Sequence, residues 1–251
     1  MLGPQRKEYL LRILVETGQV IAKAVSRELG LSEDTIRRDL RELASEGRLQ
    51  RVHGGALPAS PAVVNFAGRQ QLAGDAKVAI GRAAAAMVRP GQIVILDGGT
   101  TTLQLAKHLP PDLKATVVTH SPTIAVELVE HPSVEVVLIG GRLFKHSVVA
   151  VGSAAAEAIS RIRADVYFMG VTGIHPQAGL STGDLEESQI KRALSASAAE
   201  TYVLISAEKL NAASPYVIAA VTEIDGMVVE RGIPDEALEV YRRAGLTVHR
   251  A

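Results

Sequence analysis

A cluster of small polar residues, Asp97-Gly98-Gly99-Thr100-Thr101-Thr102, lies between a short apolar run and a helical pattern. Glycines let backbone amides turn inward, the first turn of a helix leaves N–H groups free, and threonine hydroxyls add donors, so this turn can bind an anion such as phosphate. It lacks the lysine of a P-loop and the spacing of a dinucleotide-binding turn. On this motif alone, the alternative is an ordinary glycine-rich turn.

Other polar residues follow the remaining apolar runs where strands are expected to end. In an open α/β sheet, ligands bind outside the carboxyl ends of the strands, so these residues should share one rim with the Asp97 turn. We expect Lys209 to be a second partner for phosphate or carboxylate, the alternative being a solvated loop lysine. The other residues after the expected strands are Thr119, His120, Ser121, Gly140, Gly141, Gly170 and Ser206.

A second functional pattern spans residues 31–56. Ser32 is a good N-cap, and Ile36, Leu40 and Leu43 recur at helical spacing as an apolar stripe. The other side of this expected helix carries the residues that could contact DNA, which are Thr35, Arg37, Arg38 and Arg41. Arginine can hold guanine bidentately in the major groove or grip phosphate. The stripe and the arginines together predict a helix with one buried face and one DNA-binding face.

The neighbours of this helix complete the pattern. A short helix over residues 21–29 ends at Gly30, which predicts a helix-turn-helix. After Gly47, residues 49–52 form an expected strand that returns through the turn His53-Gly54-Gly55, so a β-wing follows. Between Ser32 and Ala56 five acids match five arginines, and net charge alone therefore leaves a solvated helical hairpin as the alternative.

Bulk properties limit the function classes. The formal net charge is zero, so the chain is no polycation that binds nucleic acid or anionic membranes unspecifically. Cysteine is absent and the seven histidines show no HExxH spacing, which argues against a metal site. No apolar stretch reaches the ~18 residues of a membrane span, and the N-terminus lacks the apolar core of a signal peptide. We expect a cytoplasmic protein without a membrane partner or a cofactor.

The chain divides into two expected domains. Residues 1–57 form the head, whose first helix begins near Pro4. Residues 58–74 contain two prolines, small residues and no periodicity, which predicts a linker without packed elements. Residues 75–251 alternate helical patterns with apolar runs, ending in an edge strand over residues 246–248. Apolar strands separated by helices predict a mainly parallel, Rossmann-like sheet covered on both faces.

The segment SEDTIRRDLRELASEGRLQRVHGGA resembles the winged helix-turn-helix of DeoR-type bacterial transcriptional regulators. The resemblance implies that the chain binds a double-stranded DNA operator. The residues expected at the DNA are Ser32, Thr35, Arg37, Arg38, Arg41, Arg51, His53 and Gly54.

Residues 75–251 resemble the DeoR-type effector domain, which is similar in fold to ribose-5-phosphate isomerases and sugar-phosphate deaminases. The segments that carry the resemblance are DGGTTT at 97–102, VVTHSPTIAVEL at 117–128, GG at 140–141, VG at 151–152, GLSTGDLEESQIKRAL at 179–194 and SAEKLN at 206–211. His120 replaces the asparagine common in the family. The resemblance implies a phosphorylated sugar effector and adds Gly152, Glu187 and Lys191 to the residues expected to bind it.

An enzyme is the first alternative, because Asp184, Glu186, Glu187 and Lys191 resemble the mobile loop of the isomerases. Glu186 or Glu187 could act as the base, although adjacent residues on a helix point ~100° apart and at most one should face a pocket. A second alternative is a domain that serves only oligomerisation. We expect no catalytic residues and a homo-oligomeric regulator, a dimer or tetramer, that represses genes of sugar or carbohydrate metabolism.

Overall fold

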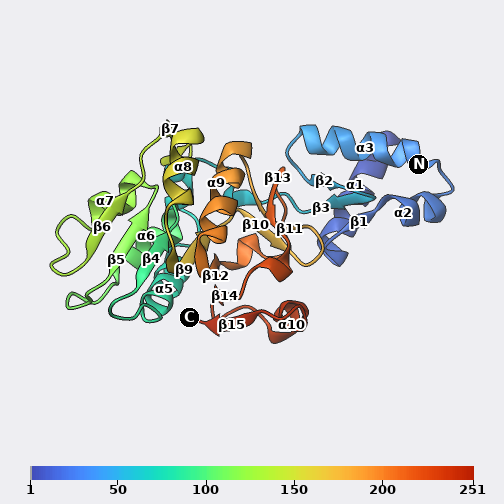
Figure 1. Ribbon diagram of the computed structural model, residues 1–251. Coiled ribbons are helices and arrows are strands. Elements are labelled where there is room, and N and C mark those ends of the chain that lie inside the picture. The colour runs from blue at the N-terminus through green and yellow to red at the C-terminus, as the bar shows by residue number, and fades with distance from the viewer. Residues whose placement is uncertain (1) are drawn as a thin grey trace.

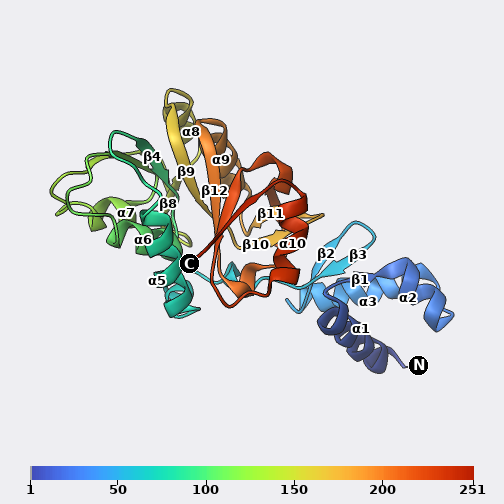
Figure 2. The ribbon, with the colours of Figure 1, turned by 90° about the horizontal axis from the view of Figure 1, so that it is seen from below.

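A small helical head and a larger α/β domain make up the fold (Figures 1 and 2), and the computed structural model describes residues 2–251. The head contains three helices and a three-stranded sheet in the order β1-β3-β2. Its elements are α1 (Gly3–Thr17), β1 (Val20–Ile21), α2 (Ala22–Leu29), α3 (Glu33–Ser45), β2 (Gln50–Val52) and β3 (Gly55–Leu57). The expected helix-turn-helix and wing are therefore confirmed, while the two-residue β1 was not predicted.

The predicted apolar stripe of α3 forms the centre of the head. Ile36, Leu40 and Leu43 are buried against Leu10 of α1. On the same side, the carboxylate of Asp39 accepts two hydrogen bonds from the guanidinium of Arg6, and both side chains are buried. A paired buried charge fixes the crossing of the two helices, because removing either partner would leave the other unsatisfied.

The wing depends on close backbone approach at Gly55. A Cβ placed there would lie 1.7 Å from the carbonyl oxygen of Val20 on β1, so only glycine lets the two strands pair. The neighbouring Gly54 has a φ of 80°, which the turn requires. These two glycines fulfil different steric needs within one turn.

The segment between head and second domain is packed, so the prediction of a linker without packed elements over residues 58–74 is wrong. It contains η1 (Pro61–Val63) and α4 (Phe66–Gln70), with Asn65 capping α4. Ala62 and Phe66 are buried. The physical reason is that elements of three and five residues are too short to show a period, although Phe66 packs into the core of the second domain.

The second domain is built on a seven-stranded parallel sheet in the order β15-β14-β12-β9-β4-β5-β6. Its strands are β4 (Ile93–Leu96), β5 (Thr116–Thr119), β6 (Glu135–Leu138), β9 (Ala164–Gly170), β12 (Ala198–Ile205), β14 (Gly226–Val229) and β15 (Thr247–Arg250). The predicted parallel sheet is confirmed, with β15 at one edge as expected. Uninterrupted apolar strands fit this arrangement because both faces of the sheet are covered.

Two sets of helices cover the two faces. One set is α5 (Gly74–Ala85), α6 (Thr100–Lys107) and α7 (Pro122–Glu127), whose apolar residues share a core with Val94 and Leu96. The other set is α8 (Ser153–Ser160), α9 (Leu185–Ala196) and α10 (Asp235–Arg243), which pack on Ile95 and Tyr167. Among residues 2–251, no helix combines the length and apolarity that a membrane span requires.

The pairing of two smaller β-structures was not predicted. The strands β7 (Arg142–Phe144) and β8 (Val149–Val151) form a hairpin beyond β6. The strands β10 (Gly173–His175), β11 (Gly179–Thr182) and β13 (Tyr216–Ala219) form an antiparallel sheet on the side of the head (Figure 1). The remaining elements are the short helices η2 (Ala207–Lys209) and η3 (Val221–Glu223).

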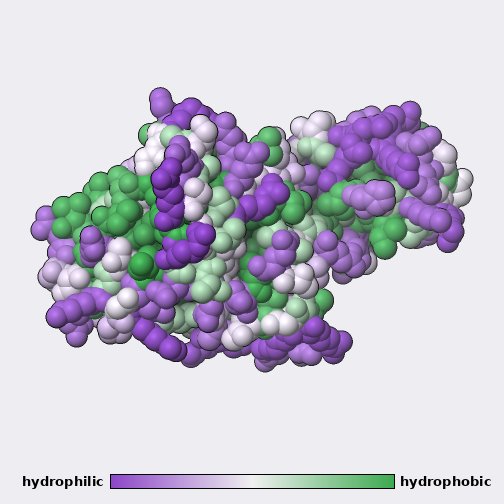
Figure 3. Space-filling view, in the orientation of Figure 1, coloured by the Kyte–Doolittle hydropathy of each residue, from purple (hydrophilic) through white to green (hydrophobic). Residues whose placement is uncertain are grey.

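The β6 edge of the large sheet has an apolar surface. Val126, Val129 and Leu138 are 71%, 70% and 51% exposed. Figure 3 shows a green patch at the end of the molecule where α7 and β6 lie, opposite the head. A groove between α7 and β6 is lined by these side chains. Exposed aliphatic side chains gathered in this way are typical of a contact surface.

Candidate functional site

The head presents the predicted DNA-contacting residues on its surface. Arg37, Arg38 and Arg41 are exposed on α3, and Arg51 and His53 are exposed on the wing. The helix starts where the sequence indicates, because the hydroxyl of Ser32 accepts a hydrogen bond of 3.2 Å from the amide of Thr35. The buried and exposed faces of α3 are thus the ones that the periodicity predicts.

The arginines of α3 differ in whether they form an ion pair. Arg37 forms an ion pair of 2.7 Å with Glu33 one turn earlier, while Arg38 and Arg41 form none with any residue from 2 to 251. An exposed i, i+4 pair contributes only a few tenths of a kcal/mol, so DNA phosphate can compete for Arg37. Arg38 and Arg41 can reach a ligand without first breaking an ion pair.

The second candidate site is a cavity at the carboxyl ends of β4, β9 and β12, as expected from the sheet topology. The turn after β4 contributes Gly98 and Gly99, and the first turn of α6 contributes Thr100, Thr101 and Thr102. The remaining residues that line the cavity are Arg69, Gly170, Val171, Thr172, Thr182, Glu187, Lys191 and Lys209. The structure therefore brings together most of the residues predicted to bind an anion.

Asp97 lies beside this cavity and holds the residues of its wall in place through hydrogen bonds. One carboxylate oxygen accepts hydrogen bonds from the amide of Gly98 (2.8 Å) and from His120 Nε2 (2.9 Å). The other accepts from the amide of Gly170 (2.7 Å) and from Lys191 Nζ. Burial raises the pKa of Asp97, but the Lys191 charge and the His120 hydrogen bond outweigh it and hold that pKa at about 2. Asp97 is thus an anion that ties three strand ends together.

His120 lies behind Asp97 and does not line the cavity, which corrects the expectation that its imidazole contacts the sugar. The ring is fully buried, with Nδ1 2.9 Å from the carbonyl oxygen of Ala150 and Nε2 on Asp97. Thr119 and Ser121 are buried with it, and the hydroxyl of Thr119 donates to the carbonyl of Leu96 at 2.7 Å. These residues support the Asp97 turn from β5, the strand next to β4 in the sheet, and do not line the cavity.

Gly141 and Gly152 also lie away from the cavity. They flank the β7–β8 hairpin, where Gly141 has a φ of 152° and a Cβ would lie 2.9 Å from the carbonyl oxygen of Val151. The reason for the error is topological, because β6 is the edge strand and the residues after it enter the unpredicted hairpin.

Four cations gather around the cavity. Burial lowers the pKa of Lys209 to about 8, with Glu208 opposing the shift and the cations Lys77, Arg69 and Lys191 adding to it. Lys209 makes no ion pair or side-chain hydrogen bond with residues 2–251. Burial also lowers the pKa of Lys191, but Asp97 and Glu187 outweigh it, so the pKa is raised overall. An uncompensated buried ammonium is unfavourable unless an anion joins it.

Thr101 carries an unpaired hydroxyl at the same cavity. Thr101 is 3% exposed, and its hydroxyl finds no hydrogen-bond partner within the described chain. It lies in the first turn of α6, beside the free amides at the start of that helix. Buried polar groups are normally satisfied, so this hydroxyl and Lys209 mark a place where an anion can add hydrogen bonds.

The two adjacent glutamates on α9 have different environments. Glu187 is buried and lines the cavity, where its carboxylate accepts from the hydroxyl of Thr182 at 2.9 Å and lies 3.4 Å from Lys191. Glu186 faces solvent and pairs with Arg142. The expectation that at most one of them faces the pocket is confirmed.

Sequence reasoning missed four cavity residues, Arg69, Val171, Thr172 and Thr182. Val171 and Thr172 connect β9 to β10, Thr182 ends β11, and Arg69 belongs to the segment interpreted as a linker. The resemblance segment at 179–194 contains Thr182 and could have indicated it. For Arg69 the only local signal was the capping residue Asn65 ahead of Phe66.

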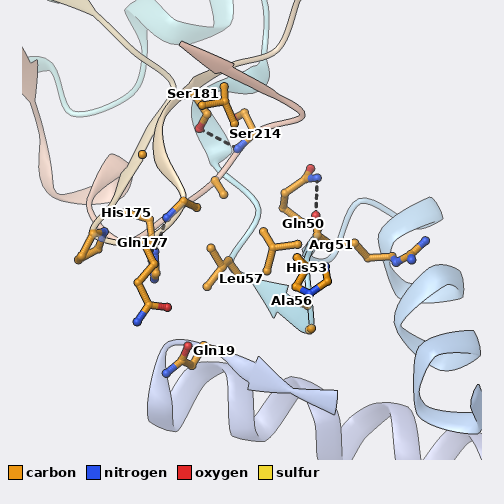
Figure 4. Close-up of a pocket in the computed structure, with 18 of the residues that line it drawn as sticks. Gln19, Gln50, Arg51, His53, Ala56, Leu57, His175, Gln177, Ser181 and Ser214 are labelled. Atoms are coloured by element: carbon orange, nitrogen blue, oxygen red, sulfur yellow. Dashed lines mark hydrogen bonds between the residues drawn. The ribbon is translucent and has the colours of Figure 1, made fainter. Parts of the chain in front are cut away.

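A larger hollow, about 670 Å³, lies elsewhere, in a cleft between the wing and the small sheet (Figure 4). The head contributes Gln19, Gln50, His53 and Leu57, and the other wall includes His175 and Gln177. Its lining has neither a buried ion pair nor a free buried hydroxyl among the described residues, so its size reflects loose contact between two domains. The smaller cavity at the strand ends has the chemistry of an anion site.

No group of three histidine, aspartate or glutamate residues that could hold a metal ion occurs within residues 2–251.

Comparison with known proteins assigns the chain to a family. The family described as "DeoR C terminal sensor domain" matches residues 73–231, and the "DeoR-like helix-turn-helix domain" matches residues 6–61.

Curated relatives align along nearly the whole chain. The HTH-type transcriptional regulator GlpR of Haloferax volcanii is 33% identical, and the alignment covers 99% of this chain and 98% of that protein. The HTH-type transcriptional repressor GlcR of Bacillus subtilis is 31% identical, covering 94% and 92%. Both are named as regulators and not as enzymes, in agreement with the expectation that the chain is not an enzyme.

Among solved structures, the ribose 5-phosphate isomerase A of Methanocaldococcus jannaschii is similar over 54% of each chain, with 15% identity and a TM-score of 0.41. A similarity this distant says nothing about activity. The two domain matches and the full-length relatives carry the assignment: the chain belongs to the DeoR family of helix-turn-helix transcriptional regulators, with a DeoR-type C-terminal sensor domain.

Proposed function

We propose that this regulator is a repressor of sugar or carbohydrate metabolism genes whose DNA affinity is controlled by a phosphorylated sugar. The observation that carries the proposal is the cavity at the strand ends, where the buried Lys209 and the free hydroxyl of Thr101 lie beside the amides of the Gly98–Thr100 turn. These groups suit a phosphate, which accepts several hydrogen bonds and compensates buried positive charge.

The DNA side of the proposal rests on the exposed face of the head. Thr35, Arg38 and Arg41 would enter the major groove from α3, and Arg51 of the wing would contact the backbone. Ser32, Arg37, His53 and Gly54 lie around the same surface and are assigned to the interface with them.

The remaining polar groups of the cavity would bind the sugar. Glu187 offers a carboxylate that lies 3.4 Å from Lys191 Nζ, and Thr182 offers a hydroxyl next to that carboxylate. Sugar hydroxyls can donate to the carboxylate and to the oxygen of the threonine, and can accept from the lysine. Asp97 would act indirectly, by holding Lys191 and the Gly98 amide in place.

The experiment uses an operator selected from a random DNA pool by the full-length protein. A panel of phosphosugars is first screened by thermal shift, since a ligand at ~100 times its dissociation constant stabilises the folded state by ~2.7 kcal/mol. Operator binding is then titrated with and without the best ligand for the parent, Lys209→Ala and Thr101→Val.

Without ligand, both variants should bind the operator within about 0.5 kcal/mol of the parent, because they lie far from the head. With ligand, both should need far more phosphosugar to respond. Thr101→Val should leave the unfolding free energy unchanged or slightly higher, since it removes an unsatisfied buried hydroxyl. An unchanged ligand response in both variants would exclude this cavity as the sensing site.

A further inference from the structure

Arg69 connects the sensor cavity to the part of the chain that carries the head. It lies on α4, within the packed segment of residues 58–72 that runs from the wing to the second domain. Its side chain lines the same cavity as Thr101 and Lys209. Of the residues that line this cavity, Arg69 is therefore the one contributed by the connection itself.

The guanidinium of Arg69 has donors to spare. One nitrogen, Nη1, donates to the carbonyl of Val64 at 2.7 Å, and the group forms no ion pair with a carboxylate in residues 2–251. Burial lowers the pKa of Arg69, while Glu187 and Asp97 oppose the shift from a distance. An arginine presents five N–H donors in a planar fork that fits phosphate, so most of its donors are available to a ligand.

Arg69 also limits the space for a ligand. The anion cavity measures about 30 Å³, and a second cavity of about 110 Å³ lies beside it. Arg69, Thr172 and Glu187 line both, so their side chains stand between the two. Because one water needs ~10–15 Å³ by this measure, the first cavity has room for about two waters and not for a sugar phosphate. Binding must displace part of this partition.

The backbone around Arg69 is fastened at several points. Lys77 Nζ donates to the carbonyls of Arg69 and Leu72. The amide of Phe66 donates to the carbonyl of His146 at 2.8 Å, and the hydroxyl of Ser60 donates to the carbonyl of Thr172. Ser60 follows the last wing residue, Leu57, by three positions. A shift of Arg69 is thus transmitted toward the wing along the short, hydrogen-bonded segment of residues 58–72.

We propose that Arg69 binds the anionic group of the effector and that this contact, by moving the partition, repositions residues 58–72 and with them the head. The inference rests on the proposed function and adds to it the residue that couples the two sites. A ligand shifts a conformational equilibrium only through contacts that differ between the two states, and Arg69 supplies such a contact. Lys209 and Thr101 belong to the second domain and supply affinity.

The test uses inorganic phosphate as the probe on the full-length protein, with chloride at equal ionic strength as the reference. Amide hydrogen exchange is followed by mass spectrometry in peptides covering residues 98–103 and residues 58–72. The variants are Arg69→Gln, which removes the charged fork, Arg69→Lys, which keeps the charge, and Arg82→Gln, an exposed arginine of α5 as the control.

In the parent and in Arg82→Gln, phosphate should slow exchange at least severalfold in both regions. In Arg69→Gln, protection should persist at 98–103 and be lost at 58–72, with partial recovery in Arg69→Lys. Protection of 98–103 alone in the parent, or protection of 58–72 that survives Arg69→Gln, would overturn the coupling role while leaving the anion site intact. Protection of neither region in the parent would overturn the anion site itself, and the coupling role with it.

Discussion

Lys209 shows how a single buried charge ties ligand binding to pH. Its folded pKa is about 8, against an ordinary value of 10.5, because burial and neighbouring cations disfavour the ammonium form. The folded state therefore releases this proton near pH 8, whereas the unfolded chain holds it until about pH 10.5. In that interval the unfolded state binds more protons, so the free energy of unfolding rises with pH.

The first prediction follows from this shift. The phosphate group of a sugar ester stays mainly a dianion above pH 7, since its second pKa is ~6, so its affinity for the cavity should fall as pH rises through about 8 and Lys209 loses its charge. In Lys209→Met this pH dependence should disappear, and the variant should be about 1–3 kcal/mol more stable than the parent at pH 7. Calorimetric titration of phosphate and denaturant unfolding at several pH values measure both effects.

The exposed lysine variant Lys114→Met is the matched control and should change neither curve. A steep loss of stability in Lys209→Met would mean that the lysine holds the fold through contacts that the charge argument omits.

Residue types after strand ends were sufficient to find Thr101 and Lys209, because a parallel sheet brings those ends together, whereas Lys191 on α9 was indicated only by the family resemblance. The same rule misplaced His120. It identifies the residues that follow a strand, but it does not show whether each side chain points into the cavity or into the protein interior. The Asp97–His120 contact joins side chains 23 positions apart, and no local pattern shows such a pairing. Arg69 was missed for a related reason, as it reaches the cavity from a segment without periodicity.

At the scale of elements, α3 and the wing have separable roles. Side chains at the start and middle of a recognition helix can reach base edges, whereas a wing mostly follows the phosphate backbone. Arg38 is exposed on α3, and Arg51 is exposed on β2 opposite Ala56.

The second prediction separates these roles. Arg38→Ala should cost ~1–3 kcal/mol at one operator position and relax the base preference there, because it removes a direct base contact. Arg51→Ala should weaken binding to all sequences alike and reduce the salt dependence. Binding to a library of single-base operator variants at two salt concentrations distinguishes the two patterns. Full specific affinity in the Arg37→Ala/Arg38→Ala double variant would remove α3 from the interface.

Element length decided which parts of the fold were predictable. Helices such as α3, with 13 residues, show their period clearly, and apolar strands such as β4 are bounded by turn residues. The strands β1, β7, β8 and β10 have two or three residues each and pair with partners that sequence periodicity does not reveal. Their pairing is set by tertiary contact, such as the approach of Gly55 to Val20.

At the scale of the molecule, one head reads few base pairs. Regulators with such heads usually present two of them to half-sites, which raises affinity through effective concentration. The apolar edge formed by α7 and β6 lies at the end opposite the head, so two copies joined there would leave both heads free. The outer side of β6 is also an unpaired strand edge.

The third prediction is therefore a homodimer that uses this edge. Leu138→Glu should raise the dimer dissociation constant about tenfold or more, because a charge replaces a side chain whose burial contributes roughly 1.5–3 kcal/mol. Val15→Glu places the same charge at an exposed valine of α1 in the head, away from this edge, and is the control. Analytical ultracentrifugation of the full-length proteins gives the constants. A monomeric parent, or an unaffected dimer in Leu138→Glu, would contradict this arrangement.

The cleft between wing and small sheet has a consequence for the spacing of operator half-sites. Because about 670 Å³ between the domains is open, the head has room to turn against the small sheet. Inserting one base pair between half-sites rotates one relative to the other by about 34° and moves it ~3.4 Å. A rigidly packed head would lose one half-site under that change, whereas a head that turns across the open cleft can follow it. Natural operators of this regulator should therefore vary in spacer length by a base pair while their half-site sequences stay the same.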